Sequence, residues 1–220
     1  MLRADRNREG LFVSRLLVLI VIVAVLAGGC DGHQSAGILR DLLGLQVGRH
    51  FTYVGEGNEY ASFELEVTHN RGSLYQLAEA TGGTVLARVV ELRRDGAYEI
   101  LTRGEHYSRE SLLTSEAIAR RDPKLDRKLL PWPLREGSSW SMSDDVTATL
   151  VTTTAQRTVP AGTFRNVVQV RTHTYSSSDP DASAATLDFY YAPGVGPIER
   201  HFNYEDVVIT SRLSEMTRSN

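Results

Sequence analysis

Short segments in which apolar and polar residues alternate dominate the chain after its first forty or so positions. In "FELEV", Phe63, Leu65 and Val67 alternate with glutamates, which is the pattern of an antiparallel strand with one face in water. Similar runs are "TVLARVVEL", "NVVQVRTHT", "TLDFYYA" and "DVVIT". Glycines in "TGG" and "RRDG" separate several of these runs and favour hairpins. The pattern predicts a mainly β protein with roughly ten to twelve strands.

Two segments give sharper local expectations. In "TVPAGTF", Pro160 fixes one turn position and Gly162 can adopt a left-handed conformation, so we expect a three-residue hairpin loop. In "YYAPGVGPIER", two glycines lie between two prolines and predict a sharp corner between two strands. Pro197 lacks an N–H group, which makes the start of the second of these strands less certain.

One segment has a helical period instead. "SRESLLTSEAIARR" carries Leu112, Ile118 and Ala119 on one side and has Ser108 as its expected N-cap. This short helix opens an insertion over residues 105–129. The basic residues that follow alternate with Asp122 and Asp126, so a solvated helix end is a better interpretation than an anion site.

A faint internal similarity divides the β region, residues 38–215. "GLQVGRHFTYV" and "PLREGSSWSMS" both place a glycine three positions before an aromatic residue, at Gly48 and Gly137. Two related β units in tandem, over 44–104 and 130–213, would explain this. Two coincidental strand starts would explain it equally well.

The first residues have the layout of an export signal. A basic lead, "MLRADRNREGLFVSR", precedes an uninterrupted apolar run over residues 16–27. Twelve helical residues span roughly 18 Å, short of the ~30 Å hydrocarbon layer. We therefore expect residues 1–29 to form a signal peptide with a helical core rather than a permanent membrane span.

The end of that run, "LAGGC", resembles the lipobox of bacterial lipoproteins. The resemblance makes Leu26, Ala27, Gly28 and Gly29 the recognition residues for signal cleavage and Cys30, the only cysteine, the site of lipid attachment, with palmitate among the acyl groups. A buried, inert thiol is the alternative. Residues 30–37 would then be a short flexible tether. Asp31 resembles the inner-membrane retention signal of some Gram-negative bacteria, which places the body on the periplasmic face.

The motifs of the second half resemble an uncharacterised family of bacterial envelope lipoproteins and exported proteins, some labelled TapB-type. The matching segments are "LPWPLREGSSWSM", "VPAGTFRNVVQV" and "YYAPGVGPIER". The resemblance implies an antiparallel curved sheet or a partly open β-barrel, similar in outline to the envelope carriers LolA and LolB. It transfers no catalytic residues.

No nucleophile elbow, metalloprotease helix, phosphate-binding loop or CxxC pair occurs in the sequence. The six histidines are scattered without an i, i+4 pair, so we expect no metal site and no cofactor. Glu64 and Glu66 share one face of their predicted strand, where a solvated sheet surface is a better interpretation than a catalytic pair. Glu91 has the same interpretation.

These observations favour a non-enzymatic, membrane-anchored envelope lipoprotein that binds an apolar ligand or an envelope partner. A formal net charge of −3 argues against nucleic acid. The alternatives are a structural subunit of an envelope assembly without a ligand, with Trp132 and Tyr190 as its exposed anchor, and a hydrolase whose site is not visible in sequence. An apolar cavity of about 300 Å³ or more would favour a carrier, and a filled core a scaffold.

Overall fold

The computed structural model describes residues 31–175 and 184–218. The chain divides into two units, residues 1–34 and 35–220, and the whole sheet belongs to the second. The predicted signal peptide, its recognition residues Leu26 to Gly29 and the predicted lipid site Cys30 lie outside the described residues.

The described helices are α2 (Asp31–Leu42), α3 (Ser115–Ala119) and the 3₁₀ turn η1 (Pro123–Leu125). The strands of the first half of the sheet are β1 (Arg49–Glu56), β2 (Phe63–Arg71), β3 (Leu74–Ala80), β4 (Val85–Arg93), β5 (Gly96–Arg103) and β6 (Arg127–Pro131). Those of the second half are β7 (Ser139–Ser143), β8 (Val146–Val159), β9 (Gly162–Thr174), β10 (Ala185–Ala192), β11 (Gly196–Tyr204) and β12 (Val207–Arg218).

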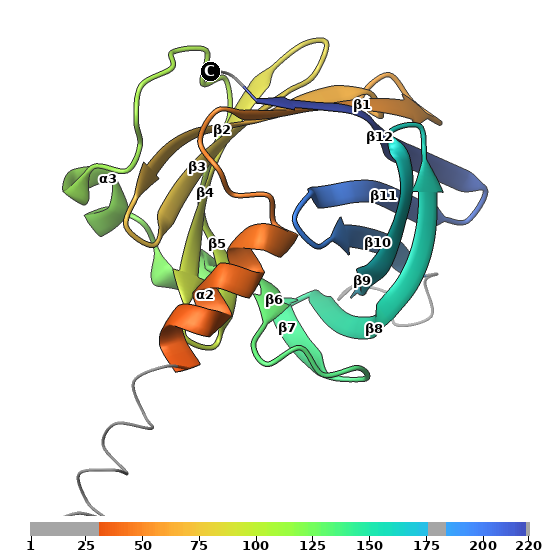
Figure 1. Ribbon diagram of the computed structural model, residues 1–220. Helices are drawn as coiled ribbons and strands as arrows, with labels where there is room; N and C mark the ends of the chain where they lie inside the picture. Colours follow the sequence, from red (N-terminus) through yellow and green to blue (C-terminus); the bar gives the residue numbers. More distant parts are fainter. Residues whose placement is uncertain (1–30, 176–183, 219–220) are drawn as a thin grey trace, which may run out of the picture. The chain divides into compact units, whose positions relative to one another are not determined.

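All twelve strands form one antiparallel sheet in the order β6-β5-β4-β3-β2-β1-β12-β11-β10-β9-β8-β7. The sheet curls until it is nearly closed, with β6 and β7 at its two edges (Figure 1). Trp140 on β7 connects these edges, because its indole Nε1–H donates to the carbonyl oxygen of Lys128 on β6 at 2.8 Å. The prediction of a mainly β, curved antiparallel sheet is confirmed.

The residues between 31 and 42 differ from the prediction. The segment expected as a flexible tether is helical from Asp31, and the part from Ser35 onward belongs to the same unit as the sheet. Leu39 and Leu42 of α2, with Leu45 just after it, are almost fully buried in the main core. Burial of these leucines outweighs the weak local preference of a glycine- and serine-containing segment.

Alternation places one apolar row per strand inside the curved sheet. Phe51 and Tyr53 of β1 stack side by side, and Tyr53 also stacks on Phe63 of β2 with ring centroids 4.3 Å apart. The hydroxyl of Tyr53 donates to the carbonyl oxygen of Pro197 at 2.6 Å, which connects the first strand to the eleventh. The core thus continues without a break between the two halves.

The insertion covers the outer face of β4 and β5. Leu112 and Leu113 are buried there against Val89 and Ile100, in a second apolar cluster. The predicted helix is present but shorter, because Leu112 and Leu113 precede it in a segment without regular secondary structure. Its N-cap is Thr114, whose side chain accepts from the N–H of Ala117, so the assignment of Ser108 as N-cap is wrong.

The two similar segments adopt the same local structure. Gly48 and Gly137 have φ values of 81° and 79°. The N–H of Gly48 donates to the carbonyl oxygen of Val67 at 2.9 Å, and that of Gly137 to Leu150 at 2.8 Å. Each glycine therefore starts a strand by the same turn. A common origin of the two halves stays a prediction.

The predicted hairpin joins β8 to β9, but its loop has two residues, because Val159 pairs with Gly162. The predicted corner joins β10 to β11. Arg49 fixes it by donating to the carbonyl oxygens of Gly194 and Val195 at 3.1 and 2.8 Å. A β-bulge beside Pro197 accommodates its missing N–H, so the strand starts at Gly196.

Candidate functional site

A chain of five alternating charges crosses the inside of the curved sheet. Its members, in order, are Arg200, Glu79, Arg88, Glu99 and Arg127, and we call them the ionic chain. Both carboxylate oxygens of Glu79 accept from Arg200, at 3.1 and 2.8 Å. Arg88 donates to Glu79 at 2.8 Å and to Glu99 at 2.6 Å, and Arg127 donates to Glu99.

Strand register explains why these charges face inward. Leu77 of β3 is opposite Arg88 of β4, Val90 of β4 is opposite Glu99 of β5, and Glu99 is opposite Arg127 of β6. None of the features predicted from the sequence includes the ionic chain. A signal was present, because Glu79 shares the phase of the apolar residues Tyr75 and Leu77 along β3.

Burial and pairing act in opposite directions on these groups. Burial by itself would raise the pKa of Glu79, but Arg200 and Arg88 lower it to about 2. Burial would likewise raise the pKa of Glu99, and Arg88 and Arg127 lower it instead. Burial would lower the pKa of Arg88, whereas its two glutamates raise it. Glu79, Arg88 and Glu99 are therefore charged at neutral pH.

Four members of the ionic chain line a pocket of about 110 Å³ inside the sheet, which we call the interior pocket. Its other lining residues are apolar or aromatic: Leu43, Leu45, Leu65, Leu77, Val90, Leu129, Met142, Phe189, Tyr191 and Pro197. The interior pocket is smaller than the apolar cavity of about 300 Å³ that would favour a carrier, so it can take one end of a ligand but not a whole large one.

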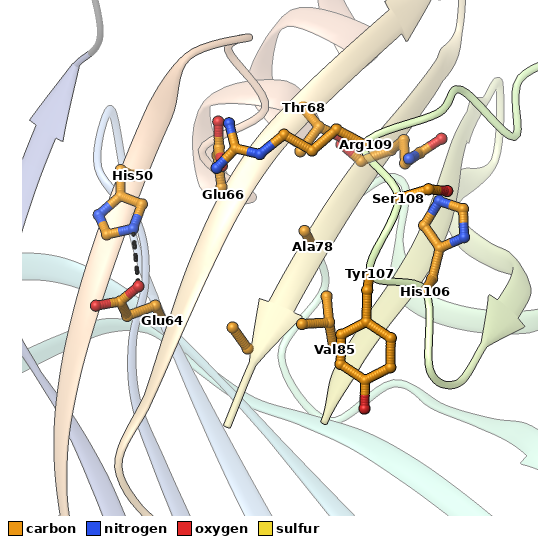
Figure 2. A pocket seen from close by; sticks show the side chains of 12 residues that line it. His50, Glu64, Glu66, Thr68, Ala78, Val85, His106, Tyr107, Ser108 and Arg109 are labelled. Carbon is orange, nitrogen blue, oxygen red and sulfur yellow. Dashed lines mark hydrogen bonds and ion pairs between the residues drawn. The ribbon is translucent and has the colours of Figure 1, made fainter. Parts of the chain in front are cut away.

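A larger depression of about 410 Å³ lies on the other face of the sheet, over β1 to β4. We call it the outer groove (Figure 2). His50, Glu64 and Glu66 form one wall, and residues 106–109 of the insertion form the other. Ala78 and Ala80 lie opposite Glu66 and Glu64 in the register, and their small side chains leave the space between the walls.

The charges of the outer groove are loosely paired. His50 Nε2 lies 3.4 Å from Glu64, and Arg109 lies 3.5 Å from Glu66. Neither carboxylate accepts a hydrogen bond from another described residue. The predicted shared face of Glu64 and Glu66 is present, while Glu91 lies elsewhere and pairs with Arg93 at 2.7 Å.

The histidines do not converge on one point. Only His50 and His106 line the outer groove, and the His106 ring lies 3.1 Å from the carbonyl oxygen of Glu110. His69 Nδ1 is buried with no hydrogen-bond partner among the described residues. In that part of the chain, no three His, Cys, Asp or Glu side chains are arranged to hold a metal ion.

The aromatic anchor proposed from the sequence is wrong for Tyr190. Its side chain is only 3% exposed and belongs to the main core, and the guanidinium carbon of Arg157 lies 3.8 Å from its ring centroid. Trp132 is partly buried against the main core. Tyr190 is therefore not exposed, and an anchor role for Trp132 stays a prediction.

This chain resembles known proteins in structure but matches none in sequence. No family model and no curated protein matches the sequence. A solved structure of a candidate lipoprotein from Parabacteroides distasonis is similar, with a TM-score of 0.46 and 13% identity over 79% of this chain and 96% of that one. A candidate exported protein with a YmcC-like fold from Bacteroides fragilis gives 0.45 and 13% over 79% and 97%.

Among the described residues, no helix combines the length and apolar character needed to cross a bilayer.

Proposed function

We propose that this chain is a non-enzymatic envelope lipoprotein, anchored by acylated Cys30, whose curved sheet binds one end of a largely apolar ligand in the interior pocket. The observation that carries the binding part is the composition of that pocket. Ten of its lining residues are apolar or aromatic, and the remaining four belong to the ionic chain. Apolar walls with a few placed polar groups are the usual composition of a ligand site.

The anchoring part depends on the beginning of the sequence. The basic lead, the apolar run and "LAGGC" together support export, cleavage before Cys30 and acylation of its thiol. Each buried methylene of an acyl chain contributes about 0.8 kcal/mol, so several chains on one residue would hold the domain at a membrane. Asp31 supports the inner membrane as its location, with the domain on the periplasmic face.

The anchor can be tested by growing cells that express the full chain with a labelled fatty acid. We expect label in the wild-type protein and in Gly37→Ala, where an added methyl group meets no atom within 4 Å. Cys30→Ser should carry no label and should keep residues 1–29. Equal labelling of Cys30→Ser and wild type would contradict the proposal.

A second candidate function is that of an interaction subunit without a ligand. One observation favours it: the hairpin between β11 and β12 exposes Tyr204, Val207 and Val208 by 37%, 48% and 49%. Apolar side chains grouped at an exposed tip are typical of a contact surface. Cross-linking in cells should then give a recurrent envelope protein that disappears when Val207 and Val208 are both changed to Ser.

A further inference from the structure

We propose that the interior pocket prefers a ligand whose buried end is negatively charged, such as the carboxylate of a fatty acid. This inference rests on the proposed function, because it assigns a chemical class to the ligand of the same pocket. The juxtaposition that carries it is an ionic chain with more positive than negative members, directly beside apolar walls.

The charges of the ionic chain do not balance. Three guanidinium groups face two carboxylates, and both glutamates are ionised at neutral pH. The surplus of one positive charge belongs to groups that line the same pocket as leucines, Met142, Phe189 and Tyr191. A charge is more costly in such surroundings than in water, so an anion beside it would be favourable.

The ionic chain also has more hydrogen-bond donors than acceptors. The Glu79 oxygens accept from Arg200 and Arg88, and the Glu99 oxygens accept from Arg88, Arg127 and Thr102. A guanidinium carries five N–H donors. Among the described residues, the Arg127 side chain donates only to Glu99, so most of its donors are free for an acceptor.

Arg127 is also the accessible end of the ionic chain. Its side chain is 47% exposed, compared with 24% for Arg88 and 21% for Arg200. A ligand can therefore reach it without displacing the inner pairs. A carboxylate can accept two parallel hydrogen bonds from one guanidinium, while the first methylenes behind it contact Leu129 and Met142.

This arrangement distinguishes between head groups. A neutral alcohol with the same tail gains the apolar contacts but leaves the surplus charge unbalanced. A quaternary ammonium adds a second positive charge beside Arg127 and is repelled. The expected order of affinity is carboxylate, then alcohol, then ammonium.

The test compares decanoate, decanol and decyltrimethylammonium, each below its aggregation limit, by isothermal titration calorimetry with the full chain in a mild detergent. Decanoate should bind at least tenfold more tightly than decanol. In Arg127→Met, decanoate should weaken to within threefold of decanol, whose own affinity should not change. Arg165→Met removes an exposed arginine without an ion pair among the described residues and should leave all three affinities as in wild type.

The outcomes separate the two proposals. Equal binding of decanoate and decanol would overturn the anion preference and leave the proposed apolar site standing. Tightest binding of the ammonium probe would also overturn it. Binding of none of the three probes would overturn the proposed ligand site itself. The wild-type comparison decides the matter even if Arg127→Met does not fold.

Discussion

The interior pocket and the outer groove contain similar residue types, but their glutamates differ in burial and in pairing. Each brings glutamates and arginine together. Inside the sheet, Glu79 is 8% exposed and accepts from two arginines at 2.8 Å. In the outer groove, Glu64 has a side chain that is 60% exposed, and the His50 ring nitrogen Nε2 lies 3.4 Å from its carboxylate.

This difference shows that burial, rather than the number of charges, decides what a carboxylate contributes. A solvated pair contributes little, because water already stabilises both ions and salt screens them. A desolvated pair is costly to assemble and still more costly to break. We therefore expect the interior charges to control stability and the groove charges to tolerate substitution.

The largest effect should come from Arg88, the central member of the ionic chain. Arg88→Met leaves Glu79 and Glu99 without their shared partner in a buried region, and should lower the free energy of unfolding by about 3–5 kcal/mol. Urea denaturation at pH 7 measures this. The matched substitution in the outer groove, Glu66→Gln, should cost less than about 1 kcal/mol. Similar losses from both variants would remove the distinction between the two sites.

Acid should give the next largest effect. Because the folded-state pKa of Glu79 is about 2 and its ordinary value is 4.5, its contribution is present above pH 4.5 and is lost as the pH falls towards 2. The free energy of unfolding should fall by roughly 3 kcal/mol over that interval. Denaturation curves at a series of pH values measure the slope.

Glu79→Gln is the control for this slope. It should be less stable than wild type at pH 7 and should lose less stability in acid, because one titrating carboxylate is gone. A wild-type protein with constant stability between pH 4.5 and pH 2.5 would show that the ionic chain is not formed as described.

The smallest of the three effects concerns the wall of the outer groove that the insertion forms. Gln76 is 1% exposed, and its side chain accepts from the N–H of Leu112 at 2.6 Å and donates to the carbonyl oxygen of Glu110 at 3.0 Å. Gln76→Ala leaves both backbone groups without this partner and should cost about 2 kcal/mol. Hydrogen exchange at the Leu112 amide should accelerate.

Thr68→Ala provides the comparison for Gln76. The Thr68 hydroxyl donates to the carbonyl oxygen of Gln76 at 3.2 Å, and its loss leaves the contacts of the insertion in place. The Leu112 amide should then exchange as in wild type. Faster exchange in Thr68→Ala as well would mean that the wall is held by the strand and not by the Gln76 amide.

Local pattern was a sufficient guide to the strands but not to the helices. The alternation of Phe63, Leu65 and Val67 predicts both a strand and its buried face, and the structure agrees. The helical period around Leu112 was misleading. Leu112 and Leu113 pack against Val89 and Ile100 and do not belong to the helix. The segment from Asp31 was misjudged for the converse reason, since its helix gains stability from a core contributed by distant strands.

The candidate sites were even harder to predict from the sequence than the helices. Glu64 and Glu66 were placed on one face correctly, because a strand has a period of two. The ionic chain was missed, since Glu79 and Arg200 are separated by 121 positions and meet only when β3 and β11 line the same interior.

The sequence by itself determined a mainly antiparallel β architecture, the strand starts that follow Gly48 and Gly137 and the prediction of an anchor at Cys30, because each depends on residues that are neighbours along the chain. Tertiary structure alone decided which charges are buried, which face the insertion covers and where α2 packs. Those properties depend on the register and closure of twelve strands, and desolvation exists only once distant segments have come together to exclude water.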